Sequence, residues 1–149
     1  MGGLKVDITK SFGKGNFLLS GGFQIEEGEI IALTGSSGSG KTTLLKMIAG
    51  LCQPDEGTIS CNEEVWYDGE HKKNLKPQKR NLGFVFQDYA LFPHMTVAEN
   101  IRFVQKNKSD WVINGLLEQM EIGNLRNRNV SFLSGGQKQR VALARALAY

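Results

Sequence analysis

Gly35-Ser36-Ser37-Gly38-Ser39-Gly40-Lys41-Thr42 is the stretch that decides the fold, and it has the spacing G-x-x-x-x-G-K-[ST]. An apolar run, residues 29–34, precedes it, and a helical pattern follows from Thr43 to about residue 50. The order strand, glycine-rich loop, helix is typical of a phosphate-binding loop, in which glycines let backbone N–H groups approach an anion. Lys41 then reaches the β- and γ-phosphates, and the Thr42 hydroxyl is placed to ligate Mg²⁺. The stretch therefore predicts nucleoside triphosphate binding.

The bulk composition fits a globular domain without an obvious nucleic-acid or membrane affinity. The chain has 149 residues, 40% hydrophobic and 22% charged, with a net charge of +3. This mild charge gives no reason to expect a nucleic-acid partner. The two cysteines, Cys52 and Cys61, have no metal-type spacing, and no apolar run approaches the roughly 18 residues of a membrane span. We expect a cytoplasmic protein whose membrane contact, if any, runs through a partner.

The first half of the chain has the patterns of β-strands around one helix. Alternating or apolar runs predict strands at residues 4–10, 17–25, 29–34, 58–61, 65–67 and 82–86. The continuous apolar run at 29–34, followed by a helix, is typical of a parallel sheet that is covered on both faces. Gly21-Gly22 predicts a bulge, and the basic run within residues 68–80 predicts a solvated loop.

The second half is predicted to be helical. Thr96 with Glu99 three residues later begins a helix over 97–104, and Ser109 caps another over 110–120. A last helix is expected over 138–149. The predicted fold is α/β: a P-loop NTPase core with an N-terminal antiparallel β piece (1–89), an inserted α-helical subdomain (90–132), and a final segment (133–149).

That final segment opens with a second candidate phosphate site, Leu133-Ser134-Gly135-Gly136-Gln137. Ser134 is a helix N-cap residue, and the two glycines leave backbone N–H groups uncovered at the positive end of a helix.

Taken together, these motifs make the whole chain resemble the ATP-binding subunits of ABC transporters. The resemblance rests on the loop 35–42 (Walker A), the apolar run that ends at Gln87, and the signature 133–137 with the residues that follow it to Ala146. It implies ATP and Mg²⁺ as cofactors, catalytic roles for Gln87 and Lys41, and Thr42 and Gln87 at the metal. The implied nucleotide contacts are Phe12, Gly35, Ser36, Ser37, Gly38, Ser39, Gly40, Lys41, Thr42, Thr43, Ser134, Gly135, Gly136 and Gln137. Phe12 is equally well explained as a stacking partner of adenine and as a core residue at a strand end.

The resemblance also implies partners and a location. Two ATPase subunits form a head-to-tail homodimer in which Ser134–Gln137 caps the γ-phosphate held by the other subunit. The segment Gln87–Val97 receives a helix of a transmembrane permease, so the protein works on the cytoplasmic face of the inner or plasma membrane. Within the family, residues 76–97 look most like molybdate-type importer ATPases, with sulfate, sugar and polyamine importers close behind.

Two family features are absent from these 149 residues: an apolar strand ending in Asp-Glu after the signature helix, and the switch histidine. The Asp supports Mg²⁺ and the Glu polarises the attacking water. We therefore expect a truncated domain that does not hydrolyse ATP by itself.

Three alternatives compete with this reading, and we reject the first of them, a GTPase. Asn107-Lys108-Ser109-Asp110 matches the guanine-reading N-K-x-D pattern of GTPases, but it precedes a helix and no D-x-x-G stands before it. A soluble ABC-type ATPase of the translation-factor or repair type is a second reading, against which the segment 89–97 favours a transporter. A non-catalytic nucleotide-binding module is the third.

Overall fold

The computed structural model describes residues 2–13 and 17–149. The chain forms two compact units, residues 1–80 and residues 81–149. The first contains a sheet and one α-helix, and the second is helical. The predicted α/β class is confirmed.

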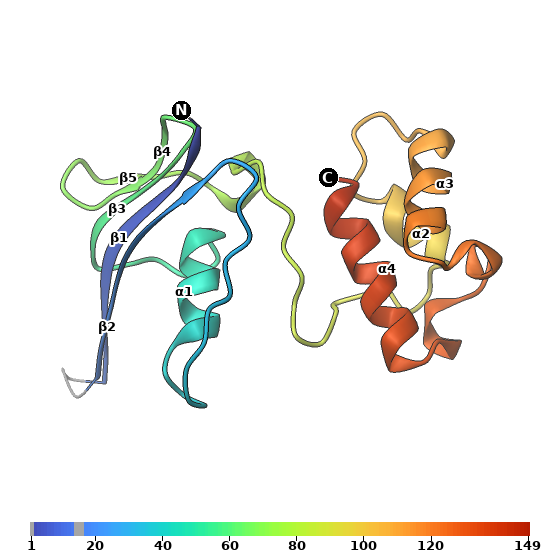
Figure 1. Ribbon diagram of the computed structural model, residues 1–149, viewed down its shortest axis with the longest axis horizontal. Coiled ribbons are helices and arrows are strands. Elements are labelled where there is room, and N and C mark those ends of the chain that lie inside the picture. The colour runs from blue at the N-terminus through green and yellow to red at the C-terminus, as the bar shows by residue number, and fades with distance from the viewer. Residues whose placement is uncertain (1, 14–16) are drawn as a thin grey trace. The chain divides into compact units, whose positions relative to one another are not determined.

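The first unit is built on one antiparallel sheet. Its strands are β1 (Gly3–Phe12), β2 (Phe17–Glu26), β3 (Glu56–Cys61), β4 (Glu64–Asp68) and β5 (Lys73–Asn74), in the order β2-β1-β3-β4-β5 (Figure 1). Along β1 the side chains of Val6 and Ile8 are buried while Lys5 and Asp7 are exposed, the alternation of a half-buried strand. The predicted N-terminal antiparallel β piece is therefore confirmed.

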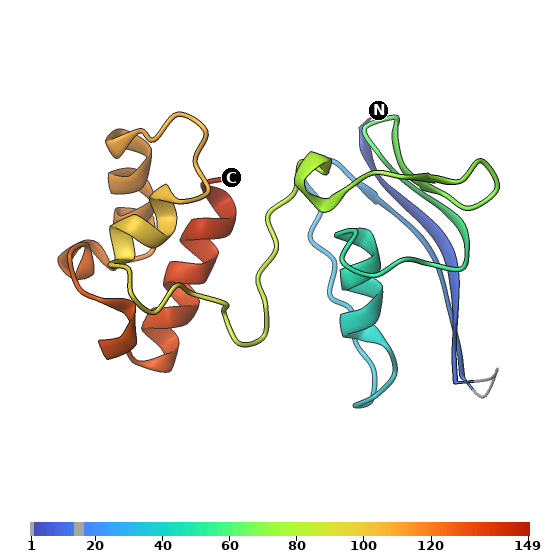
Figure 2. The same cartoon turned by 180° about the vertical axis from the view of Figure 1, so that it is seen from behind.

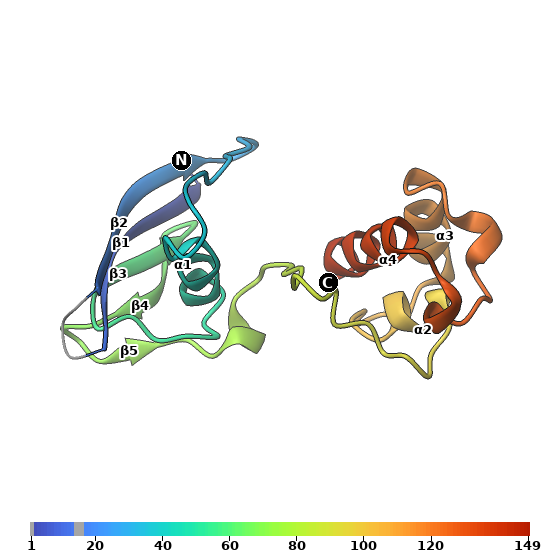
Figure 3. The ribbon, with the colours of Figure 1, turned by 90° about the horizontal axis from the view of Figure 1, so that it is seen from below.

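Helix α1 (Lys41–Ile48) lies on one face of this curved sheet (Figure 3) and buries Leu44 and Met47. A methyl group on Gly21 of β2 would lie 3.4 Å from Leu44 Cδ1. The strands β1 and β2 pair in unbroken register through Gly21 and Gly22, so the predicted bulge is wrong. Gly21 instead provides space for the helix, which is the other common reason for a glycine within a strand.

The segment 29–34, predicted to be a strand of a parallel sheet, and the segment 82–86, predicted to be a strand, are not strands in the described structure. Ile30 is 99% exposed, and Figures 1 and 2 show the chain between β2 and α1 as an extended segment beside the helix. A β-strand makes its backbone hydrogen bonds only with a neighbouring strand. Within the residues described, neither segment has such a neighbour, so the apolar pattern alone does not produce a ladder.

The segment 68–80 is more ordered than the predicted solvated loop. Strand β5 pairs with β4, and a 3₁₀ helix η1 (Pro77–Lys79) follows it. The lysines of this segment are exposed, as expected, but Arg80 is only 1% exposed. A run of basic residues has no local signal that distinguishes the one buried member.

The Arg80 guanidinium connects the end of α1 to the β4–β5 region through hydrogen bonds. Its Nη1 donates to Met47 O (2.8 Å) and Ile48 O (2.5 Å), at the carbonyl end of α1. Its other donors reach Leu75 O from Nε (3.0 Å), and Asn74 Oδ1 (3.1 Å) and Trp66 O (3.5 Å) from Nη2. Burial lowers the pKa of this guanidinium, and the negative end of the helix dipole compensates its charge.

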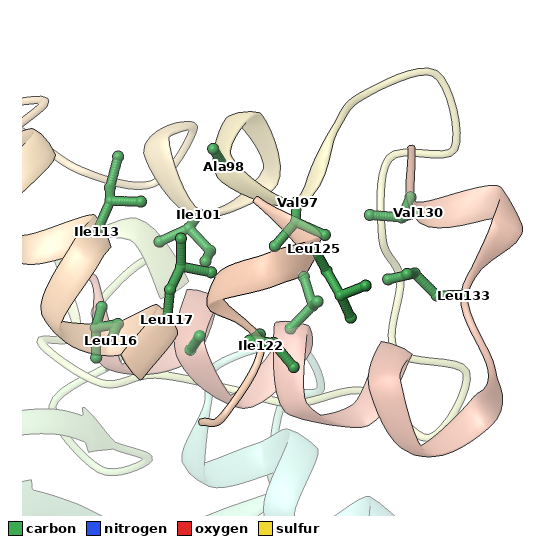
Figure 4. Close-up of a cluster of buried hydrophobic side chains, with 12 residues drawn as sticks. Val97, Ala98, Ile101, Ile113, Leu116, Leu117, Ile122, Leu125, Val130 and Leu133 are labelled. Atoms are coloured by element: carbon green, nitrogen blue, oxygen red, sulfur yellow. The ribbon is translucent and has the colours of Figure 1, made fainter. Parts of the chain in front are cut away.

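The second unit packs three helices and two 3₁₀ turns around one apolar core. They are α2 (Val97–Arg102), α3 (Asp110–Gln119), η2 (Gly123–Leu125), η3 (Val130–Phe132) and α4 (Gly135–Leu147). Figure 4 shows side chains from all three helices and the intervening turns meeting in this core, among them Ile101, Ile113 and Leu117. Helices α2 and α3 and the turns η2 and η3 thereby hold α4 and its N-terminus in place.

Helix caps account for where these helices begin. Thr96 and Glu99 form the predicted capping box at α2. Ser109 stands at the N-cap of α3 without a side-chain cap hydrogen bond, so the predicted cap there is wrong; Asp110 supplies negative charge in the first turn instead. Helix α4 begins at Gly135, three residues before the predicted start, because Ser134 and Gln137 form a capping box. In the described part of the chain, none of the helices has the length and apolar character that a membrane crossing requires.

Candidate nucleotide-binding site

The loop before α1 has a backbone that favours glycine. Gly35, Gly38 and Gly40 have φ angles of 149°, 80° and 89°, a region that residues with a Cβ rarely adopt. A Cβ on Gly40 would also lie 2.9 Å from Leu19 Cδ1 of β2, so this end of the loop is pressed against the sheet. Next to Gly38 such an atom would meet nothing within 4 Å, so the loop is open at that point.

Lys41 folds back across this loop. Its ammonium Nζ donates to Gly35 O (2.8 Å), to Ser36 O (2.6 Å) and to Ser39 Oγ (3.2 Å). The loop thus wraps around one positive charge at the point where α1 begins. These three acceptors use all three ammonium donors, so a phosphate binds here by replacing loop oxygens around a cation that already stands at the N-terminus of α1.

The N-terminus of α1 has neither a side-chain cap nor an acidic residue in its first turn, whereas α2 and α4 have capping boxes and α3, which also lacks a side-chain cap, has Asp110 there. Gly40 is its N-cap, no side chain makes a cap hydrogen bond, and no acidic residue stands in the first turn. At α2 and α4 a capping box uses the N–H groups of the N-cap residue and of the third helical residue. The first turn of α1 therefore fits a phosphate group, whose charge the helix dipole favours.

The residues present also fit Mg²⁺, provided that phosphate oxygens and water complete the coordination. Thr42 stands exposed in the first turn of α1, beside Lys41. Among the described residues no group of three or more His, Cys, Asp or Glu could hold a metal ion. Mg²⁺ commonly binds through one or two protein oxygens together with substrate phosphates, so a single hydroxyl is a sufficient protein contribution here.

Phe12 ends strand β1, half-buried, in the same unit as this loop. Its ring lies 5.9 Å from the ring of Phe17, the first residue of β2. The pair is a tilted aromatic contact that stabilises the hairpin end. The exposed remainder of the Phe12 ring is still compatible with stacking on a base, so both sequence interpretations persist.

Gln87 lies in the second unit, exposed, at the end of the segment 82–86. The chain then turns, with Tyr89 N donating to Phe86 O (2.9 Å). Tyr89 and Ala90 have φ angles of 63° and 42°, two consecutive left-handed residues that both carry a Cβ. Arg145 of α4, which sequence reasoning missed, donates to the carbonyl oxygens of both.

The signature residues form the N-terminus of α4. Ser134 Oγ accepts from Gln137 N (3.3 Å), and Ser134 N donates to Gln137 Oε1 (3.0 Å). A Cβ on Gly135 or Gly136 would meet nothing within 4 Å, so the backbone at these two residues is open. Two glycines without cover at a helix N-terminus can accept a close approach by an anion, while the capping box fixes the direction of the helix.

A depression of about 250 Å³ follows Gln87 in the second unit. It is lined by Asp88, Tyr89, Leu91, Pro93, Val130, Ser131 and Lys138. Buried Asn100 fixes one wall, because its Oδ1 accepts from Phe92 N (2.8 Å) and its Nδ2 donates to Phe92 O (3.2 Å). Ser131 Oγ donates to Pro93 O (2.8 Å) and so connects the lining residues 130 and 131 to the lining residues 91 and 93.

The N-K-x-D stretch has a different role from guanine recognition. Asp110 begins α3, and its carboxylate pairs with Arg102 and Arg126. These bonds hold the pKa of Asp110 below its usual value, with the hydrogen bond from Arg102 as the main cause. A carboxylate that two arginines already occupy is a poor partner for a base, which counts against the GTPase alternative.

The comparisons with known proteins agree with this geometry. The family model described as "ABC transporter" matches residues 19–149. A sulfate/thiosulfate import ATP-binding protein CysA of Mesostigma viride is 49% identical over 148 residues, covering 95% of this chain and 41% of that protein. The molybdenum import ATP-binding protein ModC of Haemophilus influenzae is 41% identical over 144 residues, covering 97% of this chain and 40% of that protein. The chain thus spans about two fifths of the length of these two relatives.

Proposed function

This chain belongs to the ABC transporter family, and we propose that it is the nucleotide-binding part of an ATPase subunit that powers an oxyanion importer. The observation that carries the proposal is the loop 35–40 closed around the Lys41 ammonium, before a helix whose N-terminus has no side-chain cap. In this proposal Gly35–Thr43 hold the phosphates of MgATP, with Thr42 at the metal and Phe12 against the base.

The second half of the site is proposed to act across a dimer. Ser134, Gly135, Gly136 and Gln137 would approach the γ-phosphate bound by a second copy of the subunit, arranged head to tail. The open backbone at the two glycines supports this role, because it leaves room for a phosphate at the positive end of α4. Bound ATP would then join the two subunits, and hydrolysis would release them.

Gln87 and the segment that follows it are proposed to connect nucleotide and membrane. Gln87 would contact Mg²⁺ and the attacking water, while residues 88–97 receive a helix of the permease on the cytoplasmic face of the membrane. The depression that Tyr89, Pro93 and Lys138 help to line supports a protein-docking role for this surface. The proposed segmentation remains 1–89 for the core, 90–132 for the helical subdomain, and 133–149 for the signature and its helix.

We infer the transported solute from kinship alone. The relatives are named for sulfate/thiosulfate import and for molybdenum import. Sulfate and molybdate are both tetrahedral oxyanions, and the solute is bound by other subunits of such systems. Molybdate, which the sequence favoured, therefore stands as one of two candidate solutes beside sulfate.

Transport by the assembled complex tests this proposal. The full-length protein is to be co-expressed with its permease subunits and reconstituted into vesicles, and ATP-dependent uptake of labelled sulfate and of molybdate is to be measured. We expect uptake of at least one oxyanion, abolished by Lys41→Ala. Failure to associate with any permease, or association with ribosomes or DNA, would contradict the transporter assignment and favour a soluble ABC-type ATPase.

A further inference from the structure

The chain around Gln87 is attached to helix α4 on both sides. Before Gln87, a Cβ on Gly83 would lie 2.3 Å from Ala146 O, so the two backbones are in direct contact there. After Gln87, Arg145 Nη1 donates to Ala90 O (2.7 Å) and Nη2 donates to Tyr89 O (2.8 Å). Both attachments are made by adjacent residues of the last turns of α4.

Arg145 is a buried cation that depends on these contacts. It is 8% exposed, and the described residues offer it no carboxylate partner. Its guanidinium carbon lies 5.6 Å from the centre of the Phe92 ring, a cation–π contact. Because a buried charge without compensation is strongly unfavourable, the two carbonyl oxygens and this ring are the groups that hold the guanidinium in place.

The backbone that Arg145 binds is in an unfavourable conformation. Tyr89 and Ala90 both have positive φ, although neither is glycine, asparagine or aspartate. Such backbone persists only where the surrounding structure enforces it, and it is concentrated at functional sites. The planar guanidinium donates in parallel to two adjacent carbonyls, a geometry that a lysine ammonium does not reproduce.

We propose that Arg145 is a positioning residue that fixes the turn after Gln87 to helix α4, so that α4 and the proposed docking segment, residues 88–97, move as one body. The proposal rests on the proposed function, because the roles of the two regions that Arg145 connects, the signature at the start of α4 and the docking segment 88–97, come from that function. Arg145 itself touches neither nucleotide nor permease in this role. It acts by holding the left-handed turn at residues 89 and 90.

Four variants of the full-length protein, assembled with its permease, test the proposal. Arg145→Met keeps the apolar stem and removes the donors. Ala90→Val changes the acceptor residue of the same contact and disfavours its positive φ. Because Ala90 is exposed, this replacement leaves the core around α4 unchanged. Arg145→Met combined with Ala90→Gly restores access to positive φ, because glycine adopts it freely. Arg140→Met is the matched control, since Arg140 is on the same helix and also donates to a backbone carbonyl, Met120 O.

We expect Arg145→Met and Ala90→Val to lower permease-stimulated kcat about tenfold with an unchanged KM for ATP. We expect Ala90→Gly to recover most of the loss in the Arg145→Met background, and Arg140→Met to behave as the wild type. An equal fall in kcat for Arg140→Met, or no rescue by Ala90→Gly, would show that Arg145 only stabilises the fold and would overturn the proposal.

Hydrogen exchange separates this proposal from the proposed function. In Arg145→Met the amides of residues 88–92 should exchange faster than in the wild type, while those of α2 and α3 do not change. If the wild-type protein shows no permease-stimulated hydrolysis, the proposed function fails, and this measurement still tests the contact. Unchanged exchange at 88–92 in both Arg145→Met and Ala90→Val would refute the positioning role.

Discussion

Replacing Arg80 with methionine removes all five N–H donors of a buried guanidinium while keeping most of its apolar stem. Ile48 O and Leu75 O have Arg80 as their hydrogen-bond partner, whereas Met47 O and Trp66 O also accept the backbone N–H of Gly50 and of Leu75. Two carbonyls therefore lose a buried donor, at about 1–3 kcal/mol each. Part of this is recovered because no charge remains buried, so we expect the free energy of unfolding to fall by about 2–4 kcal/mol.

The assay follows the fluorescence of Trp66 during denaturant unfolding. Trp66 is buried in the first unit with the Arg80 guanidinium carbon 5.8 Å from the centre of its ring, and the only other tryptophan, Trp111, is 84% exposed. A Trp111→Phe background makes Trp66 the single reporter. Lys79→Met is the matched control, an exposed neighbour whose replacement should change stability by about 0.5 kcal/mol or less. A loss for Arg80→Met no larger than for this control would refute the assignment of Arg80 as the clamp on α1.

Two further predictions concern the second unit. Ser134→Ala removes a helix cap worth about 1 kcal/mol and a proposed contact across the dimer. ATP-dependent dimerisation should therefore weaken in a sedimentation assay, while ATP binding to the monomer is kept. An equal fall in dimerisation and in monomer binding would contradict a nucleotide site shared between two subunits. Hydrogen bonds from Thr96 hold the pKa of Glu99 below its usual value. The stability that Glu99 contributes is therefore present above its unfolded-state pKa and is lost as pH falls through its folded-state pKa. Glu99→Gln, which keeps a capping-box acceptor, should flatten this part of the acid-unfolding curve, and an unchanged curve would rule the cap out as its cause.

The sequence predicted the elements whose hydrogen bonds are local or lie between adjacent strands. β1 and β2 pair as neighbours in the chain, and the caps at Thr96 and Ser134 depend on residues three positions apart. The segments 29–34 and 82–86 were not predicted correctly, because a strand needs a partner that an apolar pattern does not supply.

The two buried arginines were missed for different reasons. Arg80 closes a run of exposed lysines, and nothing local marks it as the buried member. Arg145 gave a readable signal, because it falls on the apolar stripe of α4, four residues after buried Val141 and one after buried Ala144. A charged residue at a core position of a helix is a reason to look for a buried partner, here the carbonyl oxygens of Tyr89 and Ala90.

The most direct test of the central claim is equilibrium titration of the protein with MgATP, comparing the wild type with Lys41→Ala and Lys46→Ala. Lys46 lies on the same helix, exposed, away from the loop, and is the matched control. Because Lys41 contributes a charge-assisted hydrogen bond worth about 1.5–3 kcal/mol, we expect Lys41→Ala to weaken binding about tenfold to a hundredfold and Lys46→Ala to bind as the wild type. Equal affinities in all three proteins, or no binding by the wild type, would contradict the assignment of residues 35–42 as the nucleotide site.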